Sequence, residues 1–124
     1  NTCVGQNAGA NITTTDYNTA VGSDALKTAT TTTKNTAIGY EALEATTTGS
    51  YNTSVGSNSL KSNTTGVSNN ALGQAALASN TTGSNNVAIG LDALNAQQTA
   101  NNNTAVGYYA LDSKTTARHK DAIG

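Results

Sequence analysis

The sequence lacks methionine, proline, tryptophan and phenylalanine, and its only aromatic residues are five tyrosines. Valine, isoleucine and leucine together number 18 among 124 residues, which is a small supply of large apolar side chains for an ordinary globule. Taken alone, such a composition is typical of disordered chains. The formal net charge of only -1 points the other way, because charge repulsion does not hold this chain open.

Basic clusters, paired cysteines and long apolar runs are also absent, and each absence disfavours a class of protein. The six basic residues are too dispersed for a nucleic-acid footprint. No apolar run approaches the length of a membrane span or of a signal-peptide core. Cys3 is the only cysteine, and we interpret it as a small buried side chain. We therefore expect neither nucleic-acid binding nor membrane insertion.

Catalytic and metal-binding patterns are missing as well. His119 is the only histidine, and the sequence pattern places no carboxylate or nucleophile beside it. The glycines never cluster as they do in a phosphate-binding loop. One acidic pair, Asp24 and Glu41, would need a third ligand to hold a metal ion. We expect no enzyme activity, no cofactor and no metal site.

What the sequence has in abundance is one repeat. Glycines recur 17 residues apart over seven steps without insertion or deletion: Gly5, Gly22, Gly39, Gly56, Gly73, Gly90, Gly107 and Gly124. An unbroken short period is typical of stacked coils that bury their apolar side only against neighbouring repeats. We predict a single repeat array over residues 1–124. Because methionine is absent and both ends fall on motif positions, we expect it to be an excerpt of a longer fibrous protein.

The repeat is more compatible with strands than with helices. Seventeen residues are too few for the two helices of a helical solenoid unit, which needs about 30 or more. Asparagine, threonine and glycine dominate each unit, and all three are turn formers or poor helix formers. We predict an all-β fold, a β-solenoid or parallel β-roll with one repeat per coil and about seven coils. The Asp-Ala-Leu type block after each glycine could be a second short strand or one helical turn.

Fixed positions in the repeat predict the role of each column. We expect an inward-pointing structural core from two aliphatic columns: Val21, Ile38, Val55, Leu72, Ile89, Val106 and Leu26, Leu43, Leu60, Leu77, Leu94, Leu111. Glycine permits the backbone conformation that a coil corner needs, at Gly22, Gly39, Gly56, Gly73, Gly90 and Gly107. Uniformly small side chains suggest close packing by another chain at Ala20, Ala37, Ser54, Ala71, Ala88 and Ala105. This last column predicts a homo-oligomer, and we expect a side-by-side trimer.

Polar columns predict contacts between successive coils. One column is asparagine throughout and is replaced only by Lys120: Asn1, Asn18, Asn35, Asn52, Asn69, Asn86 and Asn103. Stacked at about 4.8 Å, such amides can form a hydrogen-bonded ladder. Another column, Lys27, Glu44 and Lys61, alternates in charge and favours the same register. Asp24 beneath Glu41 is unfavourable unless lysines or a cation compensate.

A family resemblance rests on these repeats. Asn-Val-Ala-Ile-Gly at residues 86–90 resembles the head repeats of trimeric autotransporter adhesins. Asn-Thr-Ala-Val-Gly-Tyr-Tyr-Ala-Leu at residues 103–111, with the Thr-Thr-Gly spacer at residues 81–83, resembles repeats of bacteriophage tail fibres. The resemblance implies a left-handed parallel β-roll, three chains side by side, in an extracellular or virion fibre that contacts a cell surface. Its partner would be a cell-surface receptor or glycan, and no binding residue transfers.

Two surfaces are candidates for contact with a partner. Exposed tyrosines are frequent contact residues but equally ordinary packing residues, and the candidate surface-binding set is Thr48, Thr65, Thr82, Tyr40 and Tyr108. Tyr17 and Tyr51 share a further column. The alternative function is ice binding by two adjacent threonine columns: Thr13, Thr30, Thr47, Thr64, Thr81, Thr115 and Thr14, Thr31, Thr48, Thr65, Thr82, Thr99, Thr116. Both columns can share one surface only where the backbone is not a regular strand.

Overall fold

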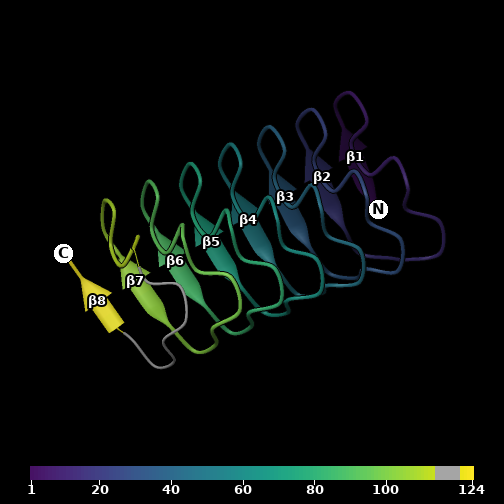
Figure 1. Cartoon of the computed structure of the whole chain (residues 1–124). Coiled ribbons are helices and arrows are strands. Elements are labelled where there is room, and N and C mark those ends of the chain that lie inside the picture. The colour runs from purple at the N-terminus through teal and green to yellow at the C-terminus, as the bar shows by residue number, and fades with distance from the viewer. Residues whose placement is uncertain (114–120) are drawn as a thin grey trace.

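The computed structural model describes residues 1–113 and 121–124 and contains one eight-stranded parallel sheet (Figure 1). Its strands follow one another in chain order: β1 (Thr2–Val4), β2 (Thr19–Val21), β3 (Thr36–Ile38), β4 (Thr53–Val55), β5 (Asn70–Leu72), β6 (Val87–Ile89), β7 (Thr104–Val106) and β8 (Asp121–Ile123). The expectations for Thr115, Thr116, His119 and Lys120 fall outside the described residues.

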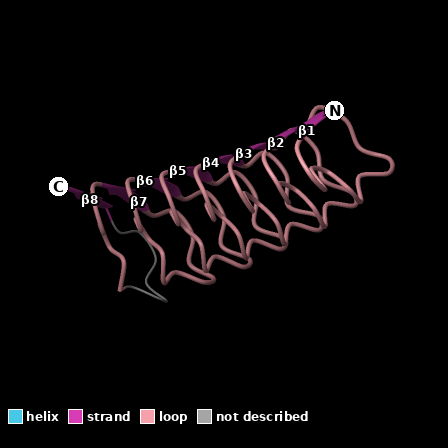
Figure 2. Cartoon of the chain, turned by 90° about the horizontal axis from the view of Figure 1, so that it is seen from above, coloured by secondary structure: helices cyan, strands magenta, loops and turns pink. Residues whose placement is uncertain are grey.

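Each strand pairs with the next in a register of one repeat. In β2 and β3, for example, Thr19 pairs with Thr36, Ala20 with Ala37 and Val21 with Ile38. The strands form one wall of the solenoid, and the turns and loops close the other side (Figure 2). The predicted all-β parallel solenoid of about seven 17-residue coils is thereby confirmed, and residues 1–113 and 121–124 contain no helix.

The block after each glycine is neither of the two expected elements, because it forms hydrogen-bonded turns. The N–H of Ala25 donates to the Gly22 carbonyl oxygen at 3.4 Å, and the N–H of Leu26 donates to the Ala42 oxygen of the next coil at 3.0 Å. Leu26 has a φ of +50°, and the leucines of the following coils share this left-handed conformation. A bulky side chain rarely adopts it, so burial has to offset the strain.

The leucine column is the confirmed part of the predicted core. Its members Leu26, Leu43, Leu60, Leu77 and Leu94 are at most 1% exposed, and Leu111 is half-buried. Alanines of the same turns, such as Ala25 and Ala42, pack with them in one cluster. Fully burying a leucine contributes about 1.5–3 kcal/mol, enough to offset a backbone strain of about 1–3 kcal/mol.

The prediction that the strand aliphatics point inward is wrong. Ile38, Leu72 and Ile89 are 40%, 41% and 39% exposed, and the valines of the column are half-buried: Val21, Val55 and Val106. Side chains alternate between the two faces of a strand. The buried asparagine lies three residues before the aliphatic residue, on the opposite face. The aliphatic side chain is therefore outward.

The expected packing column for other chains lies inside the coil instead. Ala20, Ala37, Ser54, Ala71, Ala88 and Ala105 are all 0% exposed within one chain. Their small size reflects the short distance to the opposite wall, and the one serine has its hydroxyl satisfied there. Ser54 Oγ donates to the carbonyl oxygen of Ser59 at 2.8 Å. The prediction that Cys3 of the same column is buried is wrong, because β1 is the first strand of the sheet and Cys3 is exposed there. The column therefore gives no support to an interface between chains.

The corner glycines behave as predicted. Gly22, Gly39, Gly56, Gly73, Gly90 and Gly107 have φ values between +126° and +140°. A Cβ atom on Gly73 would lie 2.4 Å from the carbonyl oxygen of Gly90 in the next coil. The corner therefore requires glycine for two reasons, its φ and the close approach of the neighbouring backbone.

The asparagine column forms the predicted ladder. The backbone N–H of Asn35 donates to Oδ1 of Asn18 at 3.0 Å, and that of Asn52 donates to Oδ1 of Asn35 at 2.8 Å. Asn35 also donates from Nδ2 to the carbonyl oxygen of Gly49 at 2.9 Å, at the turn before the next strand. Because these side chains are buried, each amide satisfies backbone groups that water cannot reach.

Candidate functional site

The outward face of the sheet carries a column of partly exposed aliphatic side chains. We call Val21, Ile38, Val55, Leu72, Ile89 and Val106 the outer aliphatic column. It is extended at the two ends by Val4 and Ile123, which are more exposed still. Strands β1 to β7 carry no charged residue on either face. A continuous apolar stripe without charge is a surface of the kind that binds another protein chain.

The tyrosines Tyr40 and Tyr108 follow the corner glycines directly and are exposed. The ring centroids of Tyr108 and Tyr109 lie 4.4 Å apart in an edge-to-face arrangement. A hydrogen bond to Tyr108 raises the pKa of the Tyr109 hydroxyl. Both candidate tyrosines, Tyr40 and Tyr108, therefore lie on the surface. They are four coils apart, so they do not form one site.

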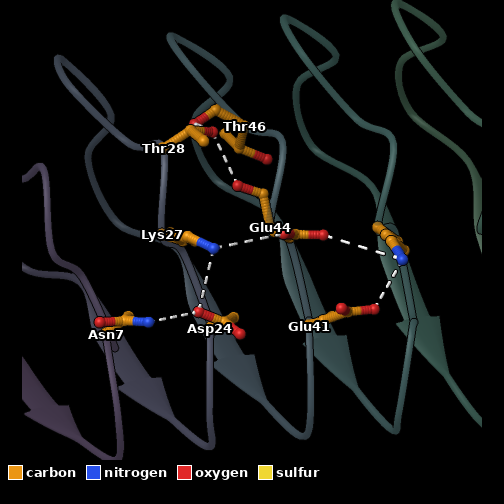
Figure 3. Close-up of polar contacts among 8 residues, drawn as sticks. Asn7, Asp24, Lys27, Thr28, Glu41, Glu44 and Thr46 are labelled. Carbon is orange, nitrogen blue, oxygen red and sulfur yellow. Dashed lines mark hydrogen bonds and ion pairs between the residues drawn. The ribbon is translucent and has the colours of Figure 1, made fainter.

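A second surface feature is a ladder of charges on the turns of the second to fourth coils (Figure 3). Asp24 accepts a hydrogen bond from Nδ2 of Asn7 at 2.9 Å and lies 3.2 Å from the Lys27 ammonium. The bond from Asn7, followed by the contact with Lys27, lowers the pKa of the Asp24 carboxyl. Lys27 also lies 4.0 Å from Glu44 in the next coil, as the alternating column predicted.

The other half of the charge ladder is built around Lys61. Its ammonium lies 2.6 Å from Glu41 and 3.8 Å from Glu44. This contact lowers the pKa of the Glu41 carboxyl and raises that of Lys61. Glu41 in turn raises the pKa of the Tyr40 hydroxyl through a hydrogen bond. The stacking of Asp24 beneath Glu41 is thus compensated by lysines, the first of the two compensations that the sequence allowed.

The threonine columns lie in bends and not in strands. In the first column, Thr47 Oγ1 donates to the Thr64 carbonyl oxygen at 3.3 Å, and Thr64 Oγ1 donates to that of Thr81 at 3.0 Å. In the second column, Thr48 and Thr65 are exposed and their hydroxyls bond no other described residue. The condition for both columns to share one surface, a backbone that is not a regular strand, is met.

A third feature was only partly visible in the sequence. Tyr17 and Tyr51 share a column with Lys34, whose ammonium lies 5.2 Å from the centre of the Tyr51 ring. We call these three residues the tyrosine–lysine row. Sequence reasoning recorded the two tyrosines and missed the lysine between them. Reading the full column at the 17-residue period would have found it.

Sequence reasoning also assigned the outer aliphatic column to the interior. The signal that could have corrected this was the asparagine, because an inward asparagine fixes alanine inward and the aliphatic residue outward by alternation. Among residues 1–113 and 121–124, no pocket opens on the surface and no three His, Cys, Asp or Glu side chains gather as metal ligands. That same part of the chain holds no helix that could cross a membrane.

Comparisons with known proteins give no match to this chain, whether the comparison is with protein-family models, curated proteins or solved structures.

Proposed function

We propose that this chain is a structural fibre segment, the shaft or head of a phage tail fibre or surface adhesin, which mediates attachment to a cell surface. Its place would be extracellular, on a cell or on a virion. It would act through stiffness and length instead of catalysis. The support is the architecture: each coil is tied to the next by strand pairing, by the asparagine ladder and by hydrogen bonds between turns.

The observation that carries the proposal is the outer aliphatic column. Three of its side chains remain about 40% exposed in a single chain, and the stripe runs along the whole described sheet. Covering such side chains would contribute up to about 1 kcal/mol each. A second copy of the chain has an identical outer aliphatic column with the same coil spacing. Two such columns packed against each other would cover the exposed aliphatic side chain of every coil. We propose a homo-oligomer, and a trimer is the form that the family resemblance implies.

The test is the molecular mass in solution, measured by analytical ultracentrifugation. Ile38→Lys with Ile89→Lys places two charges on the outer aliphatic column, and these should convert the oligomer into monomers without unfolding them. Gln98→Lys adds a charge to an exposed bend and should leave the mass unchanged. A monomeric parent chain at high concentration, or an oligomer that tolerates both column substitutions, would refute self-association through this face.

Ice binding is the second candidate. It is favoured by the exposure of Thr48, Thr65 and Thr82 in register along the axis, on a bend that also carries the neighbouring threonine column. A thermal-hysteresis measurement decides between the two functions. Absence of any freezing-point depression at high protein concentration would eliminate ice binding and leave the fibre proposal standing.

A further inference from the structure

The tyrosine–lysine row combines an unfavourable backbone conformation with exposure. Tyr17, Lys34 and Tyr51 have φ values of +67°, +57° and +61°. The same column in later coils holds Ser68, Asn85 and Asn102, which adopt left-handed φ with less strain because their side chains are short and polar. Bulky residues in this conformation cost free energy wherever they are not compensated.

The leucine column shows what compensation looks like. Leu43 and Leu60 are equally bulky at positive φ, but both are 0% exposed. Tyr17 and Tyr51, in contrast, are 75% and 54% exposed, so burial returns little of the strain. The coil therefore fixes the left-handed backbone at this position, and what distinguishes the first three coils is that they place two exposed aromatic rings and a lysine there. Exposed tyrosines are frequent contact residues in binding surfaces.

The backbone beneath the row is fixed. The N–H of Tyr51 donates to the Thr33 carbonyl oxygen at 3.1 Å, and Thr33 Oγ1 donates to the Asp16 carbonyl oxygen at 2.8 Å. The three residues therefore occupy the same position of three consecutive coils, one repeat apart. At a coil rise of about 4.8 Å, the two tyrosines stand about 10 Å apart with the lysine between them.

Lys34 differs from the lysines of the charge ladder. Lys27 and Lys61 each contact two carboxylates, whereas Lys34 forms no ion pair with any described residue. Its ammonium lies over one face of the Tyr51 ring and is otherwise open to solvent. The row therefore presents two aromatic surfaces and one cation that lacks an anionic partner.

We propose that the tyrosine–lysine row binds a linear polysaccharide that carries carboxylate groups, with the polymer lying along the solenoid axis. An extended sugar residue is about as long as the coil rise, so alternate sugars would meet the two rings. The C–H face of a pyranose packs on an aromatic ring, and Lys34 would pair with the carboxylate of the sugar between them. The described residues form no pocket, and a surface without a pocket suits a polymer better than a small ligand.

This proposal names a partner for the attachment function and does not require the oligomer. The probe is a series of hyaluronan oligosaccharides, in which uronate and N-acetyl sugars alternate, titrated into the full chain by calorimetry. The chemically matched neutral probe is a β-linked glucose oligosaccharide of the same length. We expect saturable binding of the uronate series only, and weaker binding at higher salt because the lysine contact is screened.

The two decisive tyrosine variants use asparagine, a residue that the column already contains. Tyr17→Asn and Tyr51→Asn should each weaken binding about tenfold while leaving thermal stability equal or higher, because asparagine suits the left-handed backbone. Lys34→Gln should remove the preference for the uronate series. The matched control, Asn85→Ser with Asn102→Ser, alters the same column in distant coils and should change nothing.

The outcomes separate this proposal from self-association. Uronate binding by the Ile38→Lys, Ile89→Lys variant that still falls on Tyr17→Asn or Tyr51→Asn supports the row whatever the fate of the oligomer, because the two added lysines alone would not make binding depend on the tyrosines. Absence of saturable binding, equal affinity for the neutral series, or equal affinity in the tyrosine variants and the control would overturn the proposal.

Discussion

The two faces of each strand use apolar side chains in opposite ways. The inward face carries alanine or serine, which is fully buried in β2 to β7, whereas the outward face carries valine, isoleucine or leucine that remains partly exposed. Large apolar residues therefore do not mark the interior of this solenoid strand. The difference teaches that a narrow coil is limited by volume: its strand wall has room for a methyl group and a primary amide, and the leucines of the turns fill the rest.

The largest effect should come from comparing two variants, one with a lysine on the inward face of a strand and one with a lysine on its outward face. Ala88 is 0% exposed, and its neighbour Ile89 is 39% exposed. Ala88→Lys buries an unpaired ammonium in a filled interior and should unfold the chain, a loss of about 4 kcal/mol or more. Ile89→Lys should leave the chain folded and affect only self-association. Circular dichroism and thermal melting check both, and equal melting curves would break the distinction between the faces.

The failure of hydrophobicity as a guide has a physical cause. Alternation along Val87, Ala88 and Ile89 allows only two assignments, and the usual preference for burying larger apolar groups selects the wrong one. The correct assignment depends on a polar residue, Asn86, whose amide is inside because it bonds the backbone of adjacent coils. The 17-residue period, the corner glycines, the asparagine ladder and the leucine column needed no such information, since each follows from one position in the repeat.

Other features depend on contacts that one repeat does not encode. The left-handed conformation of Leu26 opposes its intrinsic preference and is held by burial and by a hydrogen bond to the next coil. The sequence predicted the alternating charges of the Lys27 column. It did not reveal that Lys61 would contact Glu41 as well as Glu44, because that contact crosses between two columns. Likewise, the outer aliphatic column became visible as a surface only when its direction was known.

A second test compares two neighbouring asparagines that face opposite ways, Asn69 just before β5 and Asn70 at its first position. Asn69 is buried and exchanges hydrogen bonds with Asn52, Asn86 and Gly83. Asn70 is exposed and outward. Asn69→Ala should cost about 2–3 kcal/mol, because it leaves buried backbone groups without partners. Asn70→Ala should change stability by less than about 0.5 kcal/mol.

Chemical denaturation measures both values, and the ratio between them matters more than either alone. A loss for Asn69→Ala as small as that for Asn70→Ala would mean that water reaches the interior ladder. The asparagine ladder would then be no better protected from water than the exposed Asn70.

The smallest effect should come from acid, which acts on the charge ladder and not on the asparagine ladder. The asparagine ladder does not titrate, whereas the charge ladder does. The pKa values of Asp24 and Glu41 are lowered in the folded chain, so their contribution is present above the unfolded pKa and is lost as the pH falls through the folded one. On the acid side, stability should therefore decline below about pH 4, as measured by thermal melting across pH. The raised pKa of Lys61 acts at the alkaline end, where its contribution is lost only once the pH rises past its folded value.

Glu41→Gln with Asp24→Asn is the matched control, because it keeps the shapes and removes the titration. The double variant should melt at a lower temperature than the parent at pH 7 and show a weaker dependence on acid, so that the two curves converge near pH 2. The effect should be smaller than that of either buried substitution, since these charges are solvated and screened by salt. Parallel curves would show that the acid response arises elsewhere, and coincident curves would show that the charge ladder contributes nothing to the stability of the chain.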